Sequence, residues 1–244
     1  MAARARIDER SLPAADQPHE TSANGVLRPI VFGANDGLVS NLALVMGVAG
    51  ANPEPGIIVL AGIAGLLAGA FSMGVGEYIS VQSQRELLDF QVAFQRKQLR
   101  EAPEQEEAIL ARIYEERGFE PEKAKQFAHD VLEDHDHAVR LLIFEEVGLD
   151  ARSIGSPLAA AGGSFIAFTA GAIIPLLPYL LAKGDPAFFG SIAVSLVALA
   201  LLGTGIAVLT RRPIPYGAAR QMLLGGIAAA VTFAVGRLIG VQTS

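Results

Sequence analysis

Two acidic side chains stand inside long apolar stretches of this sequence. Asp36 lies about eight residues into the apolar stretch 29–53, within VFGANDGLVSNLALVMGVAGA, and Glu77 lies near the end of the second apolar stretch, within LAGAFSMGVGEYISVQSQ. Each stretch is long enough to cross a bilayer, where an ionisable group costs several kcal/mol and usually serves a function. The chemistry available to a carboxylate at that depth is the binding of a cation or a proton.

A methionine accompanies the second carboxylate. Met73 precedes Glu77 by four residues, which places it one helical turn away on the same face. Carboxylate oxygens together with a thioether favour Fe²⁺ or Mn²⁺, whereas an all-oxygen site suits Mg²⁺ or Ca²⁺. Two plainer interpretations stay open: Met73 as ordinary packing, and Glu77 as an interfacial residue that extends towards the headgroups.

The elements that position these groups are predicted transmembrane helices. Residues 55–76, 157–182 and 186–210 carry no charge, residues 29–53 carry only Asp36, and residues 213–241 carry Arg220 and Arg237. A span needs about 20 apolar residues. The sequence therefore predicts an all-α integral membrane protein with five transmembrane helices.

Composition narrows the class further. The 244 residues are 51% hydrophobic, with a mean hydropathy of +0.40, and they include no cysteine. Disulfides, thiolate metal sites and cysteine nucleophiles are therefore excluded. The formal charge of −6 argues against a nucleic-acid partner, because phosphate binding needs a clustered basic face.

Charge also divides the chain into parts. Residues 1–27 are predicted to be a disordered cytoplasmic tail, 28–85 the first two spans, 86–152 an acidic helical insert and 153–244 the last three spans. Basic residues flank the spans at the tail, at the insert and at Arg211-Arg212, so these parts are expected in the cytoplasm and the C-terminus outside. A bacterial inner membrane is the expected location, and a vacuolar membrane is the alternative.

The insert differs from the rest in charge and pattern. Between Glu86 and Arg152 there are 17 acidic and nine basic residues, a net charge of −8. Apolar residues recur at helical spacing between breaks near Pro103, Pro121 and Asp134, which predicts three cytoplasmic helices. Its acidic residues form either a solvated face or a surface that gathers cations near a pore.

Glycine pairs predict close helix packing beside the candidate ligands. Gly33 and Gly37 flank Asp36, and Gly65 and Gly69 precede Met73; small residues at this spacing let helix backbones approach closely in lipid. Five spans do not divide into an inverted repeat. A pathway between two copies of the chain is therefore expected, in a homodimer.

The runs FGANDGLVSNLALVMGVAGA and AGLLAGAFSMGVGEYISVQSQRELL, with IYEERG and EEVGL in the insert, resemble the vacuolar iron transporter family. The resemblance covers roughly residues 17 to 240. It implies a five-span dimer that moves Fe²⁺, and often Mn²⁺, out of the cytosol in exchange for protons, along a dimer interface lined by the first two spans. The family's motif positions fall on Asp36, Met73 and Glu77.

The resemblance also implies seven metal ligands in the insert. Those positions are occupied here by Gln95, Gln98, Glu106, Ile109, Leu142, Ile143 and Glu146. Only Glu106 and Glu146 remain as strong candidate ligands, because amide oxygens bind Fe²⁺ weakly and aliphatic side chains cannot bind it. The insert is then either a structural cap that attracts cations, or it carries a substitute site among the acids and histidines of residues 130–137, where a solvated turn is the simpler interpretation.

Three functions follow as hypotheses. The leading one is a transporter, not an enzyme, with Fe²⁺ or Mn²⁺ as cargo, no resident cofactor, and protons and the lipid bilayer as partners. The second is a membrane-anchored di-iron oxidase that uses insert carboxylates and His137, although the Glu-x-x-His motif of such enzymes is absent from the sequence. The third is a membrane scaffold that has lost metal handling.

Overall fold

The computed structural model describes residues 23–51, 54–147 and 155–243, and within them every regular element is helical. The side chains of residues 23–26, 146–147 and 241–243 lie outside the description. The elements are α1 (Ala23–Gly50), α2 (Pro55–Glu101), α3 (Pro103–Glu116), α4 (Pro121–Leu132), α5 (His135–Leu142), η2 (Ile143–Val147), α6 (Pro157–Ile173), η3 (Ile174–Leu176), α7 (Leu177–Leu181), α8 (Asp185–Leu209) and α9 (Ile214–Thr243).

The predicted five spans are confirmed by helices of suitable length and hydropathy. They are Leu27–Gly50, Pro55–Glu101, Pro157–Leu181, Asp185–Leu209 and Ile214–Gly240. The third span combines α6, η3 and α7, because Pro175 and Pro178 cannot donate backbone hydrogen bonds and the helix tightens to a 3₁₀ turn there. The chain is a multi-pass membrane protein.

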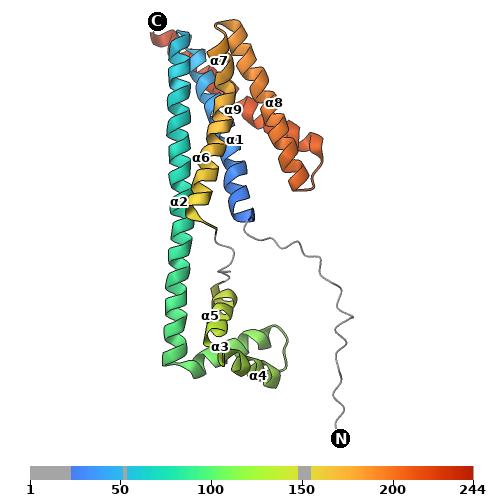
Figure 1. Ribbon diagram of the computed structural model, residues 1–244. Helices are drawn as coiled ribbons and strands as arrows, with labels where there is room; N and C mark the ends of the chain where they lie inside the picture. Colours follow the sequence, from blue (N-terminus) through green and yellow to red (C-terminus); the bar gives the residue numbers. More distant parts are fainter. Residues whose placement is uncertain (1–22, 52–53, 148–154, 244) are drawn as a thin grey trace.

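Helix α1 is central to the membrane bundle, with α6, α9 and α2 packed around it (Figure 1). Small residues make these contacts close: a Cβ on Gly33 would lie 2.7 Å from the Ser164 carbonyl oxygen, and one on Gly37 would overlap the Phe168 carbonyl. Gly65 faces the Leu44 side chain and Gly69 the Phe168 ring. Both predicted glycine pairs therefore lie at helix contacts within one chain.

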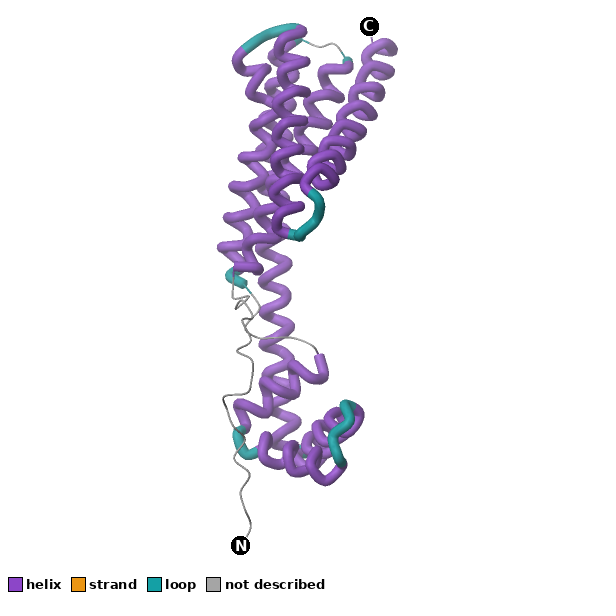
Figure 2. Tube along the Cα trace, turned by 90° about the vertical axis from the view of Figure 1, so that its right-hand side faces the viewer, coloured by secondary structure: helices purple, strands orange, loops and turns teal. Residues whose placement is uncertain are grey.

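Helix α2 continues far beyond the bundle. Its 47 residues run without a break through the boundary predicted at residues 85 and 86, and at 1.5 Å per residue they span about 70 Å. The hydrocarbon core of a bilayer is only about 30 Å thick. The remainder reaches α3, α4 and α5, which gather at its end, away from the bundle (Figures 1 and 2).

The insert has its own apolar core. Leu99 of α2 packs with Leu110 of α3, Val131 of α4 and Leu142 of α5. Arg117 forms an ion pair with Glu145, whose side chain is 3% exposed, and the Tyr114 hydroxyl donates to the same carboxylate at 3.2 Å. Burial, and then Glu145, raise the pKa of Tyr114. These contacts join the two insert segments IYEERG and EEVGL.

The start of α1 differs from the prediction. Residues 23–27, assigned to the tail from their composition, form the first turns of α1, while the rest of the tail lies outside the described residues. The insert, the start of α1 and the α8–α9 turn lie towards the same end of the bundle (Figures 1 and 2). Their assignment to the cytoplasm stays a prediction.

Candidate cation site between the first two membrane helices

Asp36 lies on the one face of α1 that its neighbours leave open. Phe32, Asp36, Ser40 and Leu44 recur every four residues; Asp36 is half-buried and the other three are exposed. The Ser40 hydroxyl donates to the backbone carbonyl of Asp36, not to its side chain. Within the described residues the Asp36 carboxylate forms no hydrogen bond or ion pair, so it is available to a ligand.

Met73 and Glu77 lie on a matching row of α2. Gly65, Gly69, Met73 and Glu77 are all half-buried and flank the buried row that faces the core. Met73 packs partly against the bundle core. We call this row, together with Phe32, Asp36, Ser40 and Leu44 of α1, the α1–α2 seam.

The register of the two helices sets the depth of each candidate ligand. Gly65 lies opposite Leu44 and Asn41, and Gly62 lies opposite Val45. Because α1 and α2 are antiparallel with the same rise per residue, Met73 falls at the depth of residues 33–36 of α1. Asp36 and Met73 therefore lie at about the same depth, within one helical turn, and Glu77 lies one turn, about 6 Å, nearer the insert.

The seam is open at this depth. Ser72 of α2 is exposed, and a Cβ added to Gly76 would meet nothing within 4 Å. Farther from the insert α1 and α2 are in contact, since a Cβ on Gly65 would overlap Leu44. The two helices thus diverge towards the insert, and the Asp36 side of the seam faces away from the rest of the chain.

Polar side chains brace the helix that carries Asp36. The side-chain amide of Gln221 on α9 donates to Oδ1 of Asn35, and the side-chain amide of Asn41 donates to the backbone carbonyl of Ala172 on α6 at 2.6 Å. Asn41 Oδ1 is buried without a hydrogen-bond partner in the described part of the chain, and it faces Gly65. The sequence reasoning missed Gln221, although one amide at the start of an otherwise apolar span was a detectable signal.

The seven positions of the insert at which the family resemblance implies metal ligands differ in their burial. Gln95 and Glu106 are buried, at 2% and 3% exposure, and Leu142 and Ile143 belong to the insert core. Gln98 and Ile109 are half-buried. Glu146 lies in η2, but its side chain is outside the described residues. The aliphatic residues at two expected ligand positions therefore have a packing role.

Residues 130–137 comprise the end of α4, a short turn and the start of α5, and their acidic and histidine side chains are exposed. Asp134 is the N-cap of α5, and its carboxylate accepts from the backbone N–H groups of Asp136 and His137, each at 3.1 Å. These bonds, that from His137 first, lower the pKa of Asp134. Asp136 also pairs with Arg96 at 3.2 Å. Among the described residues no three His, Cys, Asp or Glu side chains are grouped closely enough to hold a metal.

Comparison with known proteins tests the resemblance noted in the sequence. The model of the VIT family matches residues 27–237, which include every residue of the α1–α2 seam. The chain belongs to the VIT family. A vacuolar iron transporter of Acanthamoeba castellanii is 36% identical over 230 residues, covering 93% of this chain and 84% of that protein.

Plant members of the VIT family are similar over a comparable length. Vacuolar iron transporter homolog 1 of Arabidopsis thaliana is 33% identical over 89% of this chain and 84% of its own. Vacuolar iron transporter 1 of the same plant is 29% identical over 89% of this chain and 88% of its own. These relatives are eukaryotic, and the bacterial inner membrane stays a prediction for this VIT-family chain.

Proposed function

We propose that this protein carries Fe²⁺ or Mn²⁺ out of the cytosol in exchange for protons, with Asp36 and Met73 as the central ligands. The proposal is supported above all by the register of α1 and α2, from which we infer that an unpartnered carboxylate and a thioether lie at about the same depth of two neighbouring membrane helices. Relatives that match most of the chain are named vacuolar iron transporters, which supports a metal ion as the cargo.

A homodimer supplies the ligands that one chain lacks. First-row divalent ions take four to six ligands, whereas the seam of one chain offers two carboxylates and one thioether. The open side of the seam at Ser72 and Gly76 is where a second copy would bring its own Asp36 and Met73. We therefore place the pathway between two copies, with each α1–α2 seam facing the other.

Exchange with protons follows from the chemistry of a carboxylate in a membrane. An ionised Asp36 binds the metal ion, and when the ion leaves, the bare charge is costly at that depth and a proton neutralises it. The Met73 thioether selects softer divalent ions over Mg²⁺ and Ca²⁺. Glu77, one turn nearer the insert, passes ions between the seam and the insert side. Flux should accordingly increase when the receiving side is more acidic.

The test is metal flux into liposomes that contain the full-length protein under an imposed pH gradient. Asp36→Asn keeps the shape of the side chain and removes its charge, and we expect Fe²⁺ and Mn²⁺ flux to fall at least tenfold. Asp185→Asn is the matched control, because Asp185 is exposed at the start of α8. Equal flux in Asp36→Asn and wild type would contradict the proposal.

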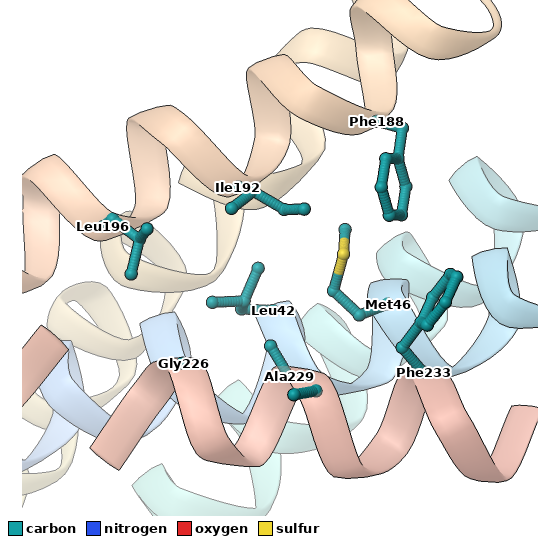
Figure 3. A pocket seen from close by; sticks show the side chains of 9 residues that line it. Leu42, Met46, Phe188, Ile192, Leu196, Gly226, Ala229 and Phe233 are labelled. Atoms are coloured by element: carbon teal, nitrogen blue, oxygen red, sulfur yellow. The ribbon is translucent and has the colours of Figure 1, made fainter. Parts of the chain in front are cut away.

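Met73 has a matched control in the same protein. Met46 lines an apolar cavity of about 250 Å³ between α1, α8 and α9, where it lies beside Phe188 and Phe233 (Figure 3). Met73→Leu should reduce the preference for Fe²⁺ over Mg²⁺, because leucine keeps the volume but cannot ligate. Met46→Leu should leave that preference unchanged. A similar effect of both substitutions would assign Met73 to packing.

The same assay separates the alternatives from the sequence. A scaffold would show no flux in wild type, and a di-iron oxidase would consume oxygen with Fe²⁺ as the electron donor. The di-iron oxidase has no supporting observation in the described part of the structure, where no three His, Cys, Asp or Glu side chains are grouped closely enough to hold a metal.

A further inference from the structure

The turn between α8 and α9 has an unusual residue at its centre. Arg211 has a φ of 52°, in the left-handed region where glycine is usual. The turn is a Schellman motif: the Arg212 N–H donates to the Ala207 carbonyl at 2.9 Å, and the Arg211 N–H to the Val208 carbonyl at 3.3 Å. An arginine at this position costs backbone energy that a glycine would avoid, and strain of this kind gathers at functional sites.

Beside this turn lies a cavity of about 420 Å³ with a mixed polar and apolar lining. Arg212 and Arg220 line it together with Thr210 and Tyr216. The Arg220 guanidinium lies 5.8 Å from the centre of the Tyr216 ring, a cation–π contact that steadies it. The lining of the cavity therefore includes two arginines, Arg212 from the turn between α8 and α9 and Arg220 from α9.

These arginines have no acidic partner in the described residues. Arg211, Arg212 and Arg220 form no ion pair there, although the chain has more acidic than basic residues. The last carbonyls of α8 are occupied, because Thr210, Arg211 and Arg212 donate to them. The positive end of the 30-residue helix α9 begins next to the cavity, at Ile214. The arginine charges and the N-terminus of α9 thus favour an anion, and they outweigh the opposing dipole of the capped C-terminus of α8.

The depth of the cavity indicates which anion. It lies where two apolar spans end, at Leu209 and Ile214, on the side of the bundle that carries the insert (Figures 1 and 2). Lipid phosphates occupy this depth in a bilayer, and basic pockets between transmembrane helices are suited to them. Apolar side chains exposed on both helices, Val208 and Leu224 among them, leave room for acyl chains below.

We propose that this cavity binds the phosphate headgroup of an anionic phospholipid from the leaflet on the insert side. Arg212 and Arg220 hold the phosphate oxygens through charge-assisted hydrogen bonds, and Tyr216 keeps Arg220 in position. The lining residues belong to α8, α9 and the turn between them, and none of them is part of the α1–α2 seam. The lipid site is therefore distinct from the candidate cation site, although α9 also packs against α1.

The test measures lipid retained by the full-length protein. Protein purified in mild detergent is mixed with phosphatidylglycerol and phosphatidylcholine, and the bound lipid is counted by native mass spectrometry. We expect preferential retention of phosphatidylglycerol, reduced about fivefold by Arg212→Gln, again by Arg220→Gln, and more by the double variant. Arg237→Gln is the matched control, since Arg237 is exposed at the other end of α9.

Three results would overturn the proposal. They are equal retention by the double variant and wild type, an equal loss in Arg237→Gln, and displacement of the lipid by inorganic phosphate, which would identify the ligand as a free anion. Arg212→Lys with Arg220→Lys keeps the charge and should retain most of the binding, which separates loss of the site from loss of folding. The readout is lipid, so it is independent of metal flux.

Discussion

At the scale of single residues, the bond between Asn35 and Gln221 determines how the helix next to Asp36 is held. Asn35 precedes Asp36 directly, and its amide oxygen accepts from a buried glutamine of α9. In lipid no water can replace a lost partner. The bond therefore fixes the rotation of α1 about its own axis at the depth of the candidate ligand.

We predict that Gln221→Leu lowers both stability and flux. It leaves the Asn35 amide without its partner and should cost about 1 kcal/mol of unfolding free energy, the usual size for hydrogen bonds between membrane helices. Unfolding at increasing concentrations of a denaturing detergent measures the loss of stability, and the liposome assay measures the loss of flux. Met222→Leu, at the exposed neighbouring position, is the control and should change neither.

This bond also shows where sequence reasoning stops. Asn35 and Gln221 are 186 residues apart, and nothing in either segment specifies that they meet. Asp36 and Met73 could be identified from their segments alone, because an acid and a thioether in apolar surroundings stand out locally. Their common depth could not, since it depends on how the α1–α2 hairpin packs.

At the scale of helices, α1 and α6 pack backbone to backbone. Gly37 faces the Phe168 carbonyl, and Gly171 faces that of Ala34, so each helix supplies a groove for the other. The sequence predicted close contacts at the Gly33–Gly37 pair but did not identify the partner helix. A repeated small residue indicates that a helix can be approached, and it carries no information on which helix does so.

Gly37→Ala should therefore destabilise the bundle, by about 1–3 kcal/mol, because the added methyl group meets backbone that cannot move aside. Gly205→Ala is the matched control: it lies within α8 with nothing within 4 Å, and it should gain up to about 1 kcal/mol from helix propensity. Thermal unfolding of the two variants in one detergent checks both signs. Destabilisation by both would refute the packing argument.

The N-cap of α5 makes part of the insert sensitive to acid. Backbone hydrogen bonds lower the pKa of Asp134 in the folded state, so its contribution to stability is complete above the unfolded pKa, near 3.8, and is lost as the pH falls through the folded value. We expect Asp134→Ala to destabilise α5 at pH 6, but not at a pH below the folded pKa of Asp134, where the wild-type side chain is protonated too. Hydrogen exchange of α5 amides, corrected for intrinsic rates, measures the difference, and a gap independent of pH would contradict the capping role.

At the scale of the whole molecule, the open seam and the absence of cysteine allow a direct test of the homodimer. Ser72→Cys introduces a single thiol on the exposed part of α2 beside the seam. If two seams face each other in the membrane, oxidation should link most chains into dimers. Ala193→Cys, exposed on α8, should remain monomeric under the same conditions. Cross-linking of both to the same low extent would argue against the proposed interface.

The overall architecture was largely predictable, and the reasons are physical. Long uncharged segments such as 186–210 can hardly form anything but a span, so five helices followed from length and hydropathy. The insert was harder, because its helices are short and amphipathic. Three of them were expected, but the continuation of α2 to Glu101 was not, since Arg85 and Glu86 mark a change of solvent without a change of helix.

Because α2 is one unbroken helix, a rotation of its membrane segment moves its far end as well. About 30 Å of it is in hydrocarbon and roughly 40 Å projects into water, with no glycine, proline or turn between Glu77 and Glu101 to act as a joint. Each degree by which α2 pivots beside α1 would carry its far tip sideways by about 0.7 Å. A small opening between α1 and α2 near Met73 would thus become a large sideways movement of the whole acidic insert. A fluorophore attached to the insert could follow that movement during a transport cycle.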